Sequence, residues 1–302
     1  MRKSFLQLHL AVFLAGFTGV LGRLITLNEG LIVWYRLLIT AATLWVIYLL
    51  TNKMQKIALK DILQLTGVGF LSALHWVFFF YGSIKYGNVS IALVCFSAIS
   101  FFSSFLEPLV NRVRINKIEL LFGLMNVLGI WLIFHFDTRY KTGIILGIVA
   151  AFLGALFPIL LKVKLKYINT QTVLNWQLTG GFITLSLAMP FYLKAFPVAS
   201  LIPSLSDFLW LLVLSWLCSV IAFQFSMYAL KKLSAFTVNL SYGLEPVYGI
   251  LMAFIIYKEN QALNMGFYLG FGIILLTLVL HTILLRREHK LSQINENANT
   301  TQ

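Results

Sequence analysis

Long apolar stretches separated by short polar or proline-containing breaks run along almost the whole chain. Each stretch holds about 20 residues, which as a helix spans the roughly 30 Å hydrocarbon core of a bilayer. Counting the stretches predicts ten membrane-spanning helices, at residues 5–25, 31–50, 62–83, 88–110, 118–136, 143–161, 171–193, 208–229, 235–256 and 263–285. The pattern therefore predicts an all-α polytopic membrane protein with no soluble domain between its spans.

Lysine and arginine are distributed unequally between the two sides of these spans. One side, which includes both termini, holds sixteen of them and the other side holds six, with Arg36 left inside the second span. Because cytoplasmic loops carry the excess of basic residues, both termini are expected in the cytoplasm, which requires an even number of spans. We expect a multi-pass protein of the plasma membrane, or of the inner membrane in a bacterium, that retains its first span.

Four short matches, in the same order and at similar offsets, relate the two halves of the chain. They pair residues 13–23 with 152–162 (offset 139), 34–37 with 175–178 (141), 81–93 with 228–240 (147), and Gly123 and Gly129 with Gly266 and Gly272 (143). Since five spans is an odd number, the second half enters the membrane from the opposite side, and a site near the midplane is expected. The chain is thus predicted to form two inverted five-helix repeats, residues 1–137 and 138–285, and a polar cytoplasmic tail, residues 286–302, whose composition predicts disorder.

The composition agrees with a membrane protein. Of the 302 residues, 60% are hydrophobic and 11% are charged, and the mean hydropathy is +0.88, which excludes an ordinary soluble domain. The net charge of +13 would suggest nucleic-acid binding in a soluble protein, but here it indicates loops that face an anionic leaflet. The expected partners are the lipid bilayer and a small-molecule substrate, without nucleic acid, and the protein is expected to be a monomer or a homodimer.

No motif in the sequence indicates a bound metal, nucleotide or other cofactor. Cys95 and Cys218 both lie in apolar stretches, without the spacing of a metal site or a redox pair. The glycines of residues 16–22 lack the spacing of a nucleotide-binding loop and favour close helix packing. We therefore expect no cofactor, no metal site and no enzyme activity.

The ninth predicted span is unusually polar for a membrane helix. Asn239, Ser241, Tyr242 and Glu245 lie inside it, and Pro246 interrupts it. A proline removes the amide partner of the carbonyl four residues earlier, so a free acceptor is expected at Tyr242. Because an ionisable residue inside a membrane usually marks a functional site, we expect Glu245 to act as a proton-coupled carboxyl or as the partner of a cation. The coupling ion is then a proton or another ion, and Gly243, Pro246 and Gly249 are predicted to form a hinge.

Other polar and aromatic residues inside the spans are candidates for the same substrate pathway. Arg36 can meet a substrate carboxylate, pair with Glu245, or extend to the membrane interface. His75 can carry protons or bond between helices, and the Trp76 ring can stack on a substrate or simply pack. The complete predicted pathway consists of Arg36, His75, Trp76, Trp176, Gln177, Gln224, Tyr228, Asn239, Ser241, Tyr242 and Glu245.

A second Leu-Glu-Pro tripeptide, residues 106–108, invites a comparison of Glu107 with Glu245. That pairing has an offset of 138, whereas the longer match just before it has an offset of 147. The longer match places Ala98 opposite Glu245. We therefore expect Glu107 to form an ion pair or to anchor a loop at the cytoplasmic end of its span.

The order and spacing of several motifs resemble the EamA family of the drug/metabolite transporter superfamily. The motifs are Trp-Tyr-Arg-Leu-Leu at residues 34–38, the loop of residues 228–237, Leu-Glu-Pro-Val at 244–247, and Ile-Tyr-Lys-Glu at 256–259 followed by Gly266 and Gly272. The resemblance covers residues 5–285. It implies two five-helix repeats around a central cavity, and the export or exchange of amino acids and other small metabolites.

The sequence thus favours a secondary transporter of small metabolites that exports amino acids or related compounds by alternating access. An intramembrane enzyme acting on lipid-linked substrates is the alternative, although the sequence shows no nucleophile with its base and no metal-ligand set for one. A channel or a sensor is a further alternative. Saturable uptake with counter-exchange would distinguish a carrier from these.

Overall fold

The computed structural model describes residues 2–136, 138–198 and 200–300, which form helices and turns without a strand. Every predicted span has a helical counterpart. The helices are α1 (Arg2–Leu24), α2 (Glu29–Leu50), α3 (Leu59–Val77) with η1 (Phe78–Ile84), α4 (Val89–Phe96) with α5 (Ile99–Asn111), α6 (Lys117–Phe136), η2 (Thr138–Tyr140), α7 (Lys141–Lys164), α8 (Thr170–Ala195), α9 (Leu205–Ser215) with η3 (Trp216–Ile221) and α10 (Ala222–Lys232), α11 (Ala235–Ser241) with η4 (Tyr242–Leu244) and α12 (Glu245–Tyr257), η5 (Glu259–Gln261) and α13 (Met265–Thr300). The predicted all-α fold is confirmed.

Seven helical stretches in the described residues are long and apolar enough to cross a membrane. They are Ser4–Leu24, Glu29–Leu50, Leu59–Ile84, Val89–Asn111, Lys141–Lys164, Leu205–Lys232 and Ala235–Tyr257, and Met265–His281 is a shorter apolar helix. The remaining predicted spans correspond to α6 and α8. The protein is therefore a multi-span membrane protein, and the count of ten spans stays a prediction.

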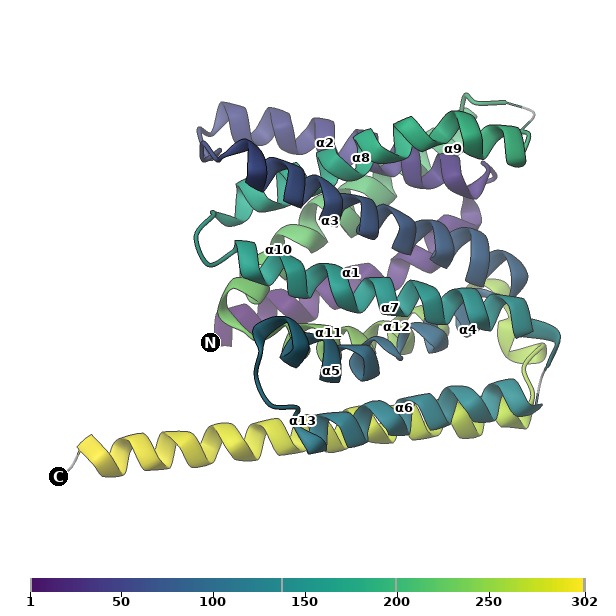
Figure 1. Ribbon diagram of the computed structural model, residues 1–302. Helices are drawn as coiled ribbons and strands as arrows, with labels where there is room; N and C mark the ends of the chain where they lie inside the picture. The colour runs from purple at the N-terminus through teal and green to yellow at the C-terminus, as the bar shows by residue number, and fades with distance from the viewer. Residues whose placement is uncertain (1, 137, 199, 301–302) are drawn as a thin grey trace.

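Corresponding helices of the two halves make corresponding contacts with the opposite half. Helix α3 packs on α8 and α2 packs on α9, while α7 contacts α3 and α5 and α1 contacts α10 and α12. Helices α6 and α13 lie side by side at one edge of the bundle, with α2 and α8 at the opposite edge (Figure 1). The two halves thus meet through matching elements, as expected of a duplicated chain.

Two of the helices are broken near their middle. Between α4 and α5 the chain turns at Ser97 and Ala98, and between α11 and α12 it forms η4 just before Pro246. The offset of 147 residues relates these two breaks to each other. The expectation of a free carbonyl at Tyr242 is wrong, because the short 3-10 turn lets that carbonyl accept the N–H of Glu245 instead.

The C-terminal helix extends further than predicted. Helix α13 runs to Thr300, so residues 286–300 are helical and the predicted disorder of the tail is wrong for them, while residues 301–302 lie outside the described residues. Arginine, glutamate, lysine, leucine and glutamine are good helix formers, and no proline or glycine follows Gly272 to end the helix.

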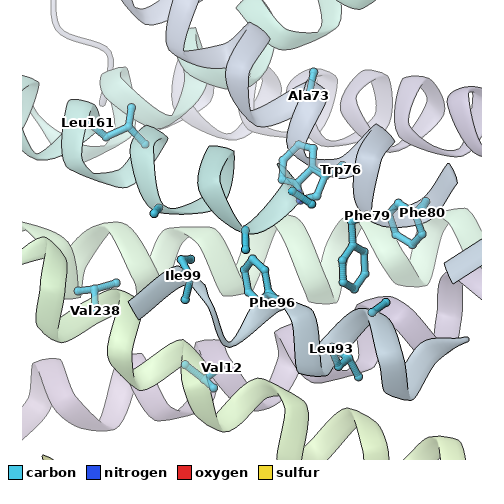
Figure 2. Close-up of a cluster of buried hydrophobic side chains, with 14 of the residues drawn as sticks. Val12, Ala73, Trp76, Phe79, Phe80, Leu93, Phe96, Ile99, Leu161 and Val238 are labelled. Atoms are coloured by element: carbon cyan, nitrogen blue, oxygen red, sulfur yellow. The ribbon is translucent and has the colours of Figure 1, made fainter. Parts of the chain in front are cut away.

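One hydrophobic core connects the two halves. Val12 of α1, Trp76 of α3, Phe96 of α4 and Val238 of α11, labelled in Figure 2, are buried and belong to the same hydrophobic cluster. Cys95 and Cys218 are free and buried. Since residues from both repeats share this core, the space inside it is where a central site can form.

Candidate functional site

A cavity of about 80 Å³ lies between the two broken helices and the helices around them. Trp76, Phe79, Phe96, Ile99, Leu161 and Val238, drawn in Figure 2, are part of its lining. Seven of the predicted pathway residues also line it: Arg36, His75, Trp76, Gln177, Asn239, Tyr242 and Glu245. A volume of this size holds several water molecules, so the polar groups that face it can be hydrated.

Arg36 places a cation in the wall of this cavity. Its side chain is 1% exposed, its Nε donates to Ser219 Oγ (2.7 Å), and its Nη2 donates to the carbonyl of Cys218 (3.2 Å). Its Nη1 has no hydrogen-bond partner, and no described carboxylate forms an ion pair with the guanidinium. The interfacial position considered from the sequence is therefore wrong, because the side chain is buried and points at other helices.

The guanidinium of Arg36 lies on an aromatic surface. Its Cζ is 4.6 Å from the centre of the Trp76 ring and 5.6 Å from that of Phe223, and the two rings are stacked with 5.4 Å between their centres. Contact with aromatic faces stabilises a cation by about 0.5 to 2 kcal/mol without neutralising its charge. The free Nη1 therefore keeps its capacity for an anionic ligand.

Glu245 brings a carboxylate to the same cavity. It is the first residue of α12 and is 6% exposed, and among the described residues its carboxylate forms neither a hydrogen bond nor an ion pair. It interacts electrostatically with Arg36 without direct contact. The alternative in which these two residues form an ion pair is not realised in this structure.

His75 bonds between helices, as one of the two alternatives predicts. Its Nδ1 lies 2.7 Å from the carbonyl oxygen of Ala150 on α7, and since a carbonyl only accepts, Nδ1 carries the proton. The ring packs against Phe96 and Phe157, with centre distances of 5.3 and 5.8 Å. These contacts fix the orientation of the imidazole in the wall of the cavity.

Two amides face the cavity in different ways. Gln177, the repeat partner of Arg36, is 2% exposed and its Oε1 has no partner. The Nδ2 of Asn239 donates to Ser103 Oγ (2.7 Å) and, at 3.4 Å, to the carbonyl of Ala155. Gln177 therefore leaves an acceptor available, whereas Asn239 ties α11 to α5 and α7.

Four predicted pathway residues do not line the cavity. Trp176 packs edge-to-face on Trp45, Gln224 donates to Tyr48 Oη (3.0 Å), Tyr228 Oη accepts from Gln171 (2.8 Å), and Ser241 Oγ donates to the carbonyl of Thr237 (2.9 Å). Each has a partner on its own or a neighbouring helix. In this structure these four side chains therefore contribute to contacts within and between helices and not to the cavity wall.

Phe223 and Ser219, which contact the guanidinium of Arg36, were not among the predicted site residues. A signal for Phe223 existed, because the offset of 147 residues relates it to Trp76, on which it stacks. No sequence signal pointed to Ser219.

The predicted hinge residues differ in their surroundings. A Cβ at Gly249 would lie 2.3 Å from Leu93 Cδ1, so this glycine permits close packing of α12 on α4. A Cβ at Gly243 would meet only Leu278, at 3.5 Å. Pro246 lies in the first turn of α12, where its missing N–H leaves no gap in the helical hydrogen bonds.

A protein family and a solved structure match the chain along most of its length. A family model described as the EamA-like transporter family matches residues 2–135 and 141–285. A solved structure described as "Crystal structure of protein" is similar to the chain at 16% identity with a TM-score of 0.68, covering 95% of this chain and 99% of that one. No curated protein matches the chain. The structural similarity supports the fold, and the two family matches correspond to the two predicted repeats.

Proposed function

Since the chain belongs to the EamA-like transporter family, and is thus a membrane transporter of the drug/metabolite type, we propose that it moves small metabolites by alternating access and exports amino acids or related compounds. The observation that carries the proposal is the unpaired charge at the cavity. Arg36 and Glu245 both face it, each without an ion-pair partner among the described residues.

The arrangement of these groups matches a zwitterion. The free Nη1 of Arg36 is a donor for a substrate carboxylate, because guanidinium and carboxylate form strong charge-assisted bonds. Glu245 and the free Oε1 of Gln177 are acceptors for a substrate ammonium. The aromatic wall around Trp76 offers a surface for an apolar side chain.

Transport energy is proposed to come from the substrate gradient or from a coupled ion, with Glu245 as the proton carrier if the ion is a proton. The protein is proposed to reside in the plasma membrane with both termini in the cytoplasm, as a monomer or a homodimer. The direction of transport rests on the family resemblance and on no feature of the cavity.

Counterflow into liposomes tests this proposal. Purified protein is reconstituted into vesicles loaded with an unlabelled apolar amino acid, and uptake of the same labelled amino acid is followed. We expect saturable, transient accumulation that the amino-acid amide and the desamino acid do not support, because each lacks one of the two charges. Uptake that neither saturates nor shows counterflow with any zwitterion would favour a channel, and an absence of any flux would favour the enzyme or sensor alternative.

A further inference from the structure

The two broken helices form an antiparallel pair on either side of the cavity. Helix α4 contacts α12, and α5 contacts α11, so the start of each broken helix lies beside the end of the other. Both breaks contribute to the cavity, with Phe96 and Ile99 from one and Tyr242 and Glu245 from the other. The pair therefore extends from the cavity in both directions along the bundle.

At one end, Glu107 closes the contact between the two broken helices. Its half-buried carboxylate, near the end of α5, accepts the backbone N–H of Ala235 (3.0 Å) and that of Phe236, the first two residues of α11. Lys162 of α7 interacts electrostatically with Glu107 and donates to the carbonyls of Leu230 (2.5 Å) and Leu233. We call Glu107, Lys162 and the start of α11 the Glu107 latch.

At the other end, Glu259 makes the corresponding contact in the opposite direction. It follows α12, is 5% exposed, and accepts the backbone N–H groups of Val89 (3.2 Å) and Ser90 (2.9 Å) and the hydroxyl of Ser90 (2.6 Å) at the start of α4. Arg23, at the end of α1, forms an ion pair with Glu259 and lies 4.4 Å from the centre of the Tyr257 ring. We call Glu259, Arg23 and the start of α4 the Glu259 latch.

The two latches are built from matching parts of the two repeats. The offset of 147 residues relates Val89 to Phe236, and the offset of 139 relates Arg23 to Lys162. In each latch a carboxylate from one repeat accepts the first N–H groups of a helix in the other repeat, beside a basic residue at the end of a third helix. The carboxylates themselves do not follow the repeat offset, because 147 residues relate Glu107 to Phe254. By its contacts, however, Glu259 and not Glu245 matches Glu107.

The latches lie at opposite ends of the pair. Ser90 and Glu107 are 17 residues apart, which corresponds to about 25 Å along a helix and approaches the thickness of a bilayer core. A carboxylate at a helix start is stabilised by the helix dipole and by charge-assisted hydrogen bonds, so each latch resists separation of the helices at its own end. Both latches are formed in this structure.

We propose that Glu107 and Glu259 are the gating residues of the two faces, and that the latches open one at a time. The inference rests on the proposed transport function and adds the residues that decide which face is open. The lysine and arginine count assigns the Glu107 latch to the cytoplasmic face and the Glu259 latch to the outer face. Release of one latch while the other holds exposes the cavity to one side only.

Thiol accessibility of the cavity tests the gating proposal without knowledge of the substrate. Ser226, which lines the cavity, is changed to cysteine in a background with Cys95→Ala and Cys218→Ala. An impermeant maleimide is then applied to right-side-out and to inside-out vesicles. We expect Glu259→Gln to speed labelling from one face and Glu107→Gln from the opposite face, each about fivefold, the factor for a lost cap of about 1 kcal/mol.

Two further pairs of variants keep the test decisive. Arg23→Gln and Lys162→Gln remove the basic partner of each latch and should open the same face as the carboxylate variant of that latch, which covers the case in which a glutamate variant fails to fold. Glu29→Gln and Asp61→Asn are matched controls, because these carboxylates pair with Lys85 (3.0 Å) and Lys164 (2.7 Å) at the ends of the bundle but hold neither broken helix. Neither control should change labelling.

Labelling that rises from the same face in both glutamate variants, or in neither, overturns the gating proposal. Opposite faces support it, including the reverse of the assigned sides, which would correct the topology alone. Opposite-face opening together with an absence of amino-acid counterflow would leave the gates standing and reject the proposed substrate. Amino-acid counterflow together with unchanged labelling in the glutamate variants would support the proposed substrate and reject the gates.

Discussion

Replacing Arg36 with methionine separates a substrate-binding role from a structural one, because the two roles predict opposite changes. Methionine has similar length and flexibility and no charge, so it fills the space beside Trp76 and Phe223. If Arg36 is kept for binding, the variant folds as well as the wild type and loses affinity. If Arg36 is a structural cation, the variant loses folded protein and keeps its affinity.

The stability change can be worked out from the contacts of Arg36. Two charge-assisted hydrogen bonds, to Ser219 and to the carbonyl of Cys218, contribute roughly 3 to 6 kcal/mol together, and the contact with the rings contributes up to about 2 kcal/mol. Against them stands the desolvation of a buried cation with no carboxylate partner, which costs several kcal/mol. These terms nearly cancel, so we expect the free energy of unfolding to change by no more than about 2 kcal/mol in either direction.

The loss of substrate affinity in the Arg36→Met variant is expected to be large enough to measure. A hydrogen bond to a charged group contributes about 1.5 to 3 kcal/mol, which corresponds to a dissociation constant roughly 10- to 150-fold higher when it is lost. The assay is the ligand-induced thermal shift of the detergent-purified protein, titrated with the amino acid that supports counterflow. Lys164→Met is the matched control, since Lys164 is a cation paired with Asp61 away from the cavity.

If the Arg36→Met variant binds the amino acid with wild-type affinity, the free Nη1 does not hold the substrate carboxylate, and the zwitterion interpretation of the cavity is wrong. The Arg36→Lys variant refines a positive result. It keeps the charge but lacks the planar fork, so an intermediate affinity is expected.

Three more outcomes are expected. Single cysteines at Ser204 and Asn297 in intact cells should show labelling by an impermeant maleimide at position 204 and none at 297, and the reverse pattern would contradict the topology. Pro246→Ala should lower the turnover rate more than the affinity, because an alanine N–H can bond to the carbonyl of Tyr242 and continue the helix through η4. A wild-type rate would exclude this break from the moving element. Glu245→Gln should fold normally, since the carboxylate has no direct partner, and should lose pH-dependent uptake while exchange persists. Uptake by Glu245→Gln that still follows pH would exclude Glu245 as the proton carrier.

The helices could be predicted well from the sequence because a membrane span is recognised by its length and its hydropathy. The offset of 147 residues found in the sequence relates both helix breaks, and it also relates Trp76 to Phe223, on which it stacks. The break at Ser97 and Ala98 was nevertheless not predicted, since neither residue is a proline or a glycine that would interrupt a helix by itself. The length of α13 was not predicted, because a polar composition is compatible both with a disordered tail and with an exposed helix.

The site was harder to predict because polarity inside a membrane has two causes. A polar side chain can face a cavity, as Gln177 does, or satisfy a neighbouring helix, as Gln224 does with Tyr48. Sequence periodicity within one helix does not distinguish these, since both directions point away from lipid. Glu259 was overlooked as a binding group for a related reason. A charged residue just past a span is common at the interface, and its partners Val89 and Ser90 lie 170 and 169 residues away in the chain.

The positions of Glu245 at the start of α12 and of Glu259 just after its end indicate how binding and gating are joined. Glu245 begins α12 and faces the cavity, and Glu259 follows the end of the same helix and holds the start of α4. A substrate can shift the balance between two conformations only by binding them with different affinity. An ammonium group that draws the Glu245 carboxylate toward Arg36 and its bound anion would displace the start of α12. Because a helix moves as a rigid rod, this displacement reaches the Glu259 latch.

The Glu107 latch holds α11, which the turn of η4 separates from α12, so the same movement leaves the Glu107 latch in place. This coupling requires the η4 break, and for that reason the Pro246→Ala variant should impair the Glu259 gate before it impairs binding.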